Sequence, residues 1–271
     1  MSGEITVRPL RSQEDLRRCV ALQYEIWGED FEECAPPSLL MATQQVAGVA
    51  AGAFDANGDL LGFVFGIGGL RDGRPVHWSD MLGVREGHRD LGLGRRLKAY
   101  QREQLLENGI EVAYWTYDPL EARNAHVNMN RLGARPVEYV PDMYGNIERG
   151  SLLRGLSTDR FIVEWELDHP RAVAALAGEL AMAPSNAPVV NSEMVEEAPV
   201  PRHLVLPDDG EVRIEIPADL HAVKNQSLDL AQSWREATRQ AFTHYMDRGY
   251  LVTGFQSEPE SHRCFYLLEL P

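Results

Sequence analysis

The residues best suited to chemistry in this sequence are two glycines in a short basic turn. Gly92 and Gly94 stand in the stretch GVREGHRDLGLGRRL, which runs from residue 83 to residue 97. Glycine lacks a Cβ atom, so it adopts positive φ easily and lets a ligand lie against the main chain. At the start of a helix, unpaired N–H groups and the positive end of the helix dipole converge on such a ligand. The stretch therefore predicts a site for an anion such as a phosphate group.

The charge around these glycines favours the same interpretation. Over the whole chain, 41 acidic residues outnumber 26 basic ones, and the formal net charge is -15. Between residues 85 and 98, however, five Arg or Lys residues stand against two acidic ones, a local net charge of +3. A solvated helix face would also show a basic stripe. Arg85 and Arg89 nevertheless precede the expected helix, whereas cations usually favour the opposite helix end.

A strand and a helix must hold this turn in place. Residues 75–84, PVHWSDMLGV, have the composition of a strand and end just before the turn. Downstream, apolar residues recur on one side of a helix that ends near Asn108 and Gly109; they are Leu93, Leu97, Tyr100 and Leu105. A dinucleotide-binding fingerprint would need a third glycine where this chain has Leu97, so that interpretation is set aside.

The spacing Arg89-x-x-Gly92-x-Gly94, between a strand and a basic amphipathic helix, resembles motif A of the GNAT superfamily of N-acetyltransferases. The resemblance implies an enzyme that binds acetyl-CoA by its pyrophosphate and moves the acetyl group to a small amine or amino-acid-like acceptor. The cofactor-binding residues that it implies are Leu82, Gly83, Val84, Arg89, Asp90, Leu91, Gly92, Leu93, Gly94, Arg95 and Asn124.

The resemblance also suggests which groups move protons. Counting back from Arg89 places Asp80 and Trp78 on the strand face where family members carry Glu or His, so Asp80 is the candidate base. A carboxylate paired with an arginine for structure alone is the alternative interpretation. His77 ranks lower because its strand parity is opposite. Main-chain groups of residues 82–84 are expected to polarise the thioester carbonyl.

The general acid is where this chain departs from the family. Family members usually carry a tyrosine four residues before the glycine that closes the next helix, and this chain has Met129 at that position. Tyr144 is the candidate replacement, with Tyr117 and Tyr139 as alternatives that spacing does not separate. The departure motivates a second hypothesis, a regulatory module of GNAT descent that binds acyl-CoA without turnover.

The acceptor is expected to approach an acidic segment between the first two helices. Residues 29–33, EDFEE, hold four acids, and in the family this region borders the acceptor site. A negative field there would attract an amine, although a solvated loop would have the same composition.

Residues 1–168 are predicted to form the GNAT domain, with an α/β (α+β) fold in which helices flank a mixed, mostly antiparallel central sheet. The expected helices span residues 12–28, 36–46, 93–108 and 120–132. The expected strands span residues 5–10, 49–54, 60–67, 75–84, 111–117, 135–140 and 160–167. Two stretches, DPLEARNA from Asp118 and STDRFIVEW from Ser157, also resemble a predicted bacterial acetyltransferase branch that carries a C-terminal extension.

The rest of the chain is predicted to form an appendage. Residues 169–203 are expected to hold a short helix and a proline-rich linker, and residues 204–271 a smaller β-α-β-β unit. The turn between Pro217 and Ser227 contains no glycine, so it cannot copy the phosphate site. We expect a structural or homodimer-forming role for this unit.

Composition limits the class of protein. A chain of 271 residues with 44% hydrophobic and 25% charged residues is typical of a soluble globular protein. The N-terminus lacks an apolar leader and no segment approaches 18 apolar residues, so we expect a cytoplasmic protein without a membrane partner. A pI near 5.0 makes nucleic acid an unsuitable partner. The three cysteines lack zinc-ligand spacing, and no metal site is expected.

Overall fold

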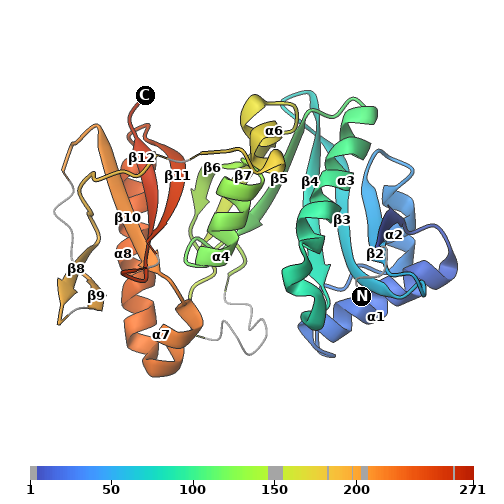
Figure 1. Ribbon diagram of the computed structural model, residues 1–271, viewed down its shortest axis with the longest axis horizontal. Helices are drawn as coiled ribbons and strands as arrows, with labels where there is room; N and C mark the ends of the chain where they lie inside the picture. The colour runs from blue at the N-terminus through green and yellow to red at the C-terminus, as the bar shows by residue number, and fades with distance from the viewer. Residues whose placement is uncertain (1–4, 146–154, 182, 197, 203–206, 259) are drawn as a thin grey trace. The chain divides into compact units, whose positions relative to one another are not determined.

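The computed structural model describes most of the chain: residues 5–145, 155–181, 183–196, 198–202, 207–258 and 260–271. The chain forms two compact units (Figure 1), residues 1–115 with 166–176, and residues 116–165 with 177–271. This division differs from the predicted boundaries at residues 168 and 204, because residues 116–165 group with the C-terminal segment. The assignment of residues 1–168 as an acetyltransferase domain stays a prediction.

The first unit is built on a mixed sheet with the strand order β1-β2-β3-β4-β5. Its strands are β1 (Thr6–Pro9), β2 (Val49–Phe54), β3 (Leu60–Arg71), β4 (Arg74–Val84) and β5 (Val112–Tyr117). The first four pair antiparallel in sequence, whereas β4 and β5 pair parallel. The sheet is therefore mixed and mostly antiparallel, as predicted.

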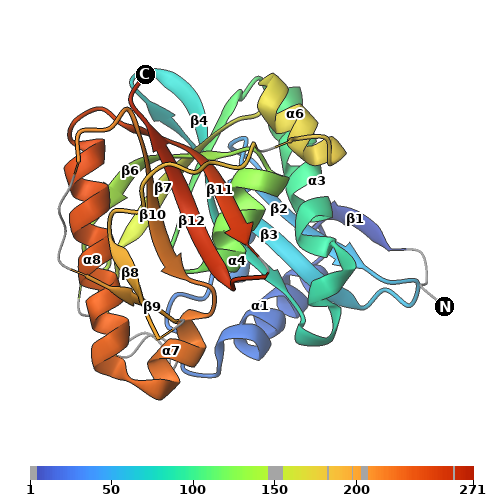
Figure 2. The ribbon, with the colours of Figure 1, turned by 60° about the vertical axis from the view of Figure 1, so that its left-hand side comes forward.

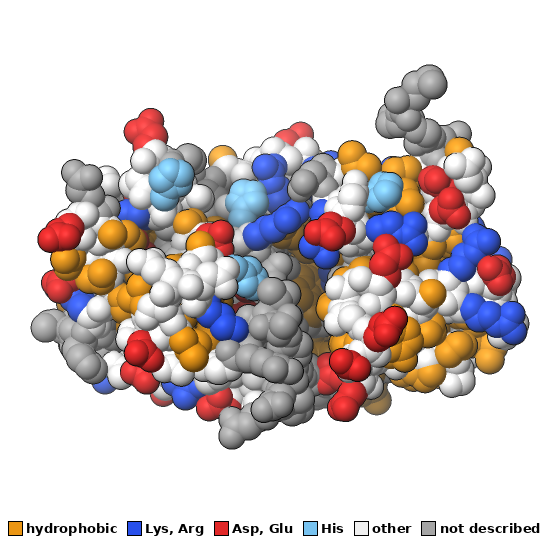
Figure 3. Space-filling view, turned by 90° about the horizontal axis from the view of Figure 1, so that it is seen from below, with side chains coloured by type: hydrophobic (Ala, Val, Ile, Leu, Met, Phe, Trp, Pro, Cys, Tyr) orange, Lys and Arg blue, Asp and Glu red, His pale blue; other side chains and the backbone are white. Residues whose placement is uncertain are grey.

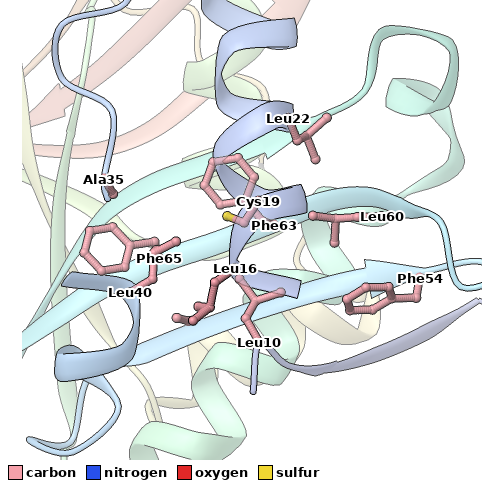
Figure 4. Close-up of a cluster of buried hydrophobic side chains, with 11 residues drawn as sticks. Leu10, Leu16, Cys19, Leu22, Ala35, Leu40, Phe54, Leu60, Phe63 and Phe65 are labelled. Atoms are coloured by element: carbon pink, nitrogen blue, oxygen red, sulfur yellow. The ribbon is translucent and has the colours of Figure 1, made fainter. Parts of the chain in front are cut away.

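Helices cover both faces of this sheet. α1 (Gln13–Trp27) and α2 (Pro37–Thr43) lie on one face and bury an apolar cluster that includes Phe63 and Phe65 of β3 (Figure 4). A capping box starts α1, because Ser12 and Asp15 bond each other's main-chain N–H groups. α3 (Leu93–Glu107) lies on the other face, and η1 (Glu86–Leu91), a 3₁₀ helix, joins it to β4. α6 spans Pro170–Ala177.

The second unit contains an antiparallel pair, β6 (Arg135–Val140) and β7 (Arg160–Glu166), and a three-stranded antiparallel sheet of order β10-β12-β11. The latter comprises β10 (Glu211–Pro217), β11 (Leu251–Glu258) and β12 (Arg263–Glu269). α8 (Leu228–Met246) packs against β10 (Figure 2). This arrangement contains the predicted β-α-β-β order.

Two features of the second unit were not expected. A hairpin of β8 (Ser192–Val195) and β9 (Ala198–Pro201) stands where an aperiodic linker was predicted. The turn after β10 contains an additional helix, α7 (Leu220–Gln226), whose N-terminus is capped by Asp219.

The helix predicted over residues 120–132 is α4 (Ala122–Ala125) continued by a π-helical segment, η2 (His126–Arg131).

Charged side chains of both signs are interspersed on the face seen in Figure 3. Among the described residues, no helix combines the length and the apolar character needed to cross a bilayer.

Candidate functional site

β4 and β5 lie side by side over a short stretch only. Their register pairs are His77 with Ala113 and Trp78 with Tyr114. Beyond Trp78, the described residues of β4 as far as Val84 have no register partner on β5, so the two strands separate there. Main-chain N–H and C=O groups on that side of β4 thus lack sheet partners and are open to a ligand.

A β-bulge at Asp80 changes the alternation of β4. Met81 pairs with Phe65 and Ser79 pairs with Gly66, which leaves Asp80 as the extra residue. Ser79 bonds side chains of α3, whereas Met81 packs against the apolar cluster under α1. The side chains of Ser79 and Met81, two positions apart, therefore face opposite sides of the sheet. The count back from Arg89 assumed that side chains alternate between the two faces of β4 without interruption. This assumption does not hold across the bulge.

The main chain of β4 turns specific groups toward the opening. The N–H of Arg85 donates to the carbonyl of Leu61 in β3 at 2.8 Å. In an antiparallel pair such bonded positions alternate, so Gly83 also bonds β3, while the N–H and C=O groups of Leu82 and Val84 point away from it. Leu82 and Val84 thus offer main-chain groups on the side where β4 has left β5.

α3 begins without a capping side chain. Gly92, the residue before the helix, has φ 70° and ψ 14°, and no side chain caps its first turn. The first helical bond runs from the N–H of Arg96 to the carbonyl of Gly92 at 3.1 Å. The N–H groups of Leu93, Gly94 and Arg95 precede it and have no helical acceptor.

The two glycines leave open the space that side chains would occupy beside these N–H groups. A Cβ atom at Gly92 would meet nothing within 4 Å, and one at Gly94 would meet only Leu82 Cδ2, at 3.5 Å. The predicted cradle therefore fits a pyrophosphate in shape and in its donors. Leu91 is exposed and Leu93 is buried, and the side chain of Asp90 lies outside what the structure describes.

The basic stretch is less uniform than its composition suggests. Arg85 pairs with Glu25 through bonds of 2.8 and 3.0 Å, and Arg96 donates to the carbonyl of Ile5. Arg89 is exposed and donates to the carbonyl of Val84 at 3.4 Å. Lys98 is buried beneath the helix, so it does not contribute to the surface charge at the cradle.

Lys98 belongs to a buried polar network that the sequence reasoning missed. Its Nζ donates to Ser79 Oγ at 2.7 Å and to Gln101 Oε1 at 3.1 Å, and it lies 3.9 Å from the centre of the Trp115 ring. Gln101 Nε2 lies 3.0 Å from Nε2 of His77. Burial lowers the pKa of Lys98 to about 7, and burial together with the charge of Lys98 lowers the pKa of His77 to about 3. The sequence signal for this network is a Lys and a Gln, three residues apart, on the apolar face of α3.

Asp80, the candidate base, is an exposed residue at the bulge. Partial burial of its carboxyl raises the pKa of Asp80 above the ordinary value. Among the described residues no ion pair to Asp80 is found, so an arginine-paired structural carboxylate has no support there.

The three candidate tyrosines lie in different surroundings. Tyr117 is buried and bonds Tyr266, and the hydroxyl of Tyr139 donates to Asp159. Burial raises the pKa of Tyr117 and of Tyr139, and the charge of Asp159 raises that of Tyr139 further. Tyr144 is half-buried, and its hydroxyl lies 2.9 Å from Thr116 Oγ1.

Two further positions from the sequence lie in the second unit. Met129 is fully buried in η2, which agrees with an apolar packing role. Asn124 is exposed in α4. Within the described part of the chain, no three His, Cys, Asp or Glu side chains gather as metal ligands would.

Solved structures similar to this chain include acetyltransferases. The ribosomal-protein-S18-alanine N-acetyltransferase of Escherichia coli is 13% identical with a TM-score of 0.47, and the match covers 61% of this chain and 96% of that one. YncA of Salmonella typhimurium, solved with its cofactor acetyl-CoA, is 16% identical with a TM-score of 0.48, covering 68% and 100%. An acetyltransferase of the GNAT family from Streptococcus pneumoniae is 17% identical with a TM-score of 0.47, covering 59% and 98%. No protein-family model and no curated protein matches the chain.

Proposed function

We propose that the chain is an N-acetyltransferase of the GNAT superfamily, which transfers an acetyl group from acetyl-CoA to a small amine or amino-acid-like acceptor. The observation that carries the proposal is the uncapped start of α3. There three N–H groups have no helical acceptor, Gly92 and Gly94 place no side chains beside them, and a neighbouring segment of β4 has separated from β5. Acetyl-CoA, when bound, would supply the activated acetyl thioester.

Main-chain groups perform the binding in this proposal. The N–H groups of Leu93, Gly94 and Arg95 hold the pyrophosphate, with Arg89 beside them as an exposed cation. The N–H of Leu82, which points away from β3, donates to the thioester carbonyl oxygen and stabilises the negative charge that develops on it.

An amine is the acceptor that the first unit favours. Trp27 at the end of α1 stacks on Phe31 with 5.0 Å between ring centres, and it is 38% exposed. The four acids of residues 29–33 follow in the chain. A Cβ at Gly83 would lie 3.2 Å from the Trp27 ring, so this acidic and aromatic segment adjoins β4 at the proposed thioester site. Aromatic faces and carboxylates both attract an ammonium group.

Asp80 moves a proton in this proposal. Asp80 takes a proton from the acceptor ammonium, directly or through water, and its raised pKa suits that task. The amine nitrogen then bonds the acetyl carbon, the carbon–sulfur bond breaks, the nitrogen releases its second proton to solvent, and the departing sulfur takes up a proton from solvent. Tyr144 stays a prediction for the acid: it is half-buried, whereas Tyr117 is buried and the hydroxyl of Tyr139 donates to Asp159.

One observation favours the alternative, a module that binds acyl-CoA without turnover. Met129 is fully buried at the position where the family carries its acid, and it has no proton to give.

The two functions are separated by thiol release. The full chain is incubated with acetyl-CoA and a panel of primary amines, and free coenzyme A is measured with a thiol reagent. We expect release that depends on one class of amine and exceeds acetyl-CoA hydrolysis without amine. Tight binding of acetyl-CoA with no amine-dependent release would overturn the enzyme and support the binding module.

A further inference from the structure

Lys98 of α3 lies at the point where β4 and β5 separate. The last register pair of the two strands is Trp78 with Tyr114. The next residues along the strands are Ser79 and Trp115. The buried amine of Lys98 reaches both, because Nζ donates to Ser79 Oγ at 2.7 Å and lies 3.9 Å from the centre of the Trp115 ring. One side chain therefore contacts the first residue beyond that pair on each strand.

A second residue of α3 completes these contacts. Gln101 Oε1 accepts hydrogen bonds from Lys98 Nζ and from Ser79 Oγ, each at 3.1 Å, and Gln101 Nε2 lies 3.0 Å from His77 Nε2. All four side chains are buried. A buried amine is costly to desolvate unless its hydrogen bonds are made, so the network holds residues 77–79 of β4 to α3 in one arrangement.

α3 also contacts β4 beyond the bulge. The extra residue Asp80 places Leu82 on the same face of the sheet as Ser79, where a Cβ atom at Gly94 would lie 3.5 Å from Leu82 Cδ2. Gly94 and Lys98 are one helical turn apart. The helix that offers N–H groups to the pyrophosphate thus contacts β4 on both sides of the bulge.

The arrangement that this network opposes is further pairing of β4 with β5. Neighbouring parallel strands gain hydrogen bonds by pairing along their length, and pairing beyond Trp78 would cover the N–H of Leu82. The amine of Lys98 holds Ser79 to α3 and keeps β4 away from β5 after that point. The direction of the Leu82 N–H therefore depends on Lys98.

We propose that Lys98 is a positioning residue, which fixes the separation of β4 from β5 and so aims the Leu82 N–H at the thioester carbonyl. The inference rests on the proposed function, because it takes acetyl-CoA as the ligand of β4 and of the start of α3. Lys98 acts through Ser79 and Trp115 from beneath the helix and touches neither the acetyl group nor the acceptor.

Isotope-edited infrared spectroscopy of acetyl-CoA, labelled with ¹³C at the acetyl carbonyl and bound to the full chain, tests this inference. A hydrogen bond to the carbonyl oxygen lowers its stretching frequency, so the band reports whether the Leu82 N–H is aimed at it. Lys98→Met keeps much of the side-chain length and removes the amine. We expect its carbonyl band at a higher frequency than in the parent and kcat lowered by roughly tenfold or more, while the Kd for acetyl-CoA stays within about threefold.

Three further variants separate positioning from lost stability. Leu105→Ala opens a cavity at a fully buried position later in α3, and it should lower stability while leaving the band and the kcat of the folded fraction unchanged. Ser79→Ala removes the acceptor of the amine and should act like Lys98→Met, whereas Ser79→Thr keeps the hydroxyl and should restore most of the parental band. If Lys98→Met does not fold, Ser79→Ala decides by the same two readouts.

An unchanged band in folded Lys98→Met would overturn the inference, as would a shifted band with an unchanged kcat, or the same shift in Leu105→Ala. A failure of the proposed function is recognised in the unaltered chain. If that chain binds no acetyl-CoA, both proposals fall. If it binds acetyl-CoA without turnover, the band alone decides whether Lys98 aims the Leu82 N–H.

Discussion

Asp80 occupies the bulge of β4, two residues before the N–H that we assign to the thioester carbonyl. Asp80→Asn keeps the shape of the side chain and removes its ability to accept a proton. Because general bases typically contribute about 10²–10⁴-fold, we expect kcat to fall by that order with little change in the Kd for acetyl-CoA. Steady-state kinetics and calorimetry on the same preparation measure both quantities.

Thermal unfolding of Asp80→Asn supplies the control. An exposed residue should change stability little, since surface substitutions usually stay within about 0.5 kcal/mol. If the folded fraction of Asp80→Asn turns over at the parental rate, Asp80 is not the base. The acceptor ammonium group would then lose its proton to solvent.

His77 is buried and neutral, and its protonation should oppose folding. Burial and the charge of Lys98 lower its pKa from 6.5 to about 3. Between those values the unfolded chain binds this proton more tightly than the folded chain. The free energy of unfolding should therefore fall as the pH drops from 6.5 toward 3, with His77 contributing up to about 1.4 kcal/mol per pH unit.

Urea unfolding at several pH values isolates this contribution. The free energy of unfolding of the parent should fall relative to that of His77→Gln as the pH falls through that window, because glutamine does not titrate. The matched variant His262→Gln, at an exposed histidine, should keep the parental slope. Parallel curves for the parent and His77→Gln would contradict a neutral buried His77.

At the scale of elements, periodicity predicted most of the first unit. The helix expected over residues 12–28, the strand formers of residues 75–84 and the apolar stripe of the helix after Gly92 all correspond to the elements observed. Local composition decides such features, so one sequence suffices to find them.

The bulge at Asp80 and the separation of β4 from β5 could not be predicted in this way. A bulge adds one residue of ordinary type to a strand and leaves no pattern in the sequence. Pairing with β5 depends on residues more than thirty positions away. The assignment of faces along β4 failed for this reason, and the network of His77, Ser79, Lys98 and Gln101 went unnoticed.

The C-terminal helices show the same limit. α8 was expected from its apolar spacing, but its bonds to Asp142 and Asp159 join residues about eighty to one hundred positions apart. Long-range ion pairs of this kind have no local signature in the sequence. The sequence therefore predicted only an appendage for residues 204–271.

At the scale of the whole molecule, the chain is acidic and yet is proposed to bind a polyanion. Among the described helices, several use their own side chains at the N-terminus. Asp219 caps α7 and Ser227 caps α8, each accepting a hydrogen bond from a main-chain N–H. Compared with these two helices, α3 offers its first N–H groups to a ligand, so we expect one acetyl-CoA per chain.

Calorimetric titration of acetyl-CoA into the full chain, into Gly94→Val and into Glu103→Val tests this central claim. The valine at position 94 would stand in the space left for the phosphates, whereas Glu103 is an exposed position later in the same helix. We predict one site per chain in the parent and in Glu103→Val, and a Kd weakened by more than roughly tenfold, about 1.4 kcal/mol, in a folded Gly94→Val. Unchanged affinity in folded Gly94→Val, or two sites per chain, would contradict the account.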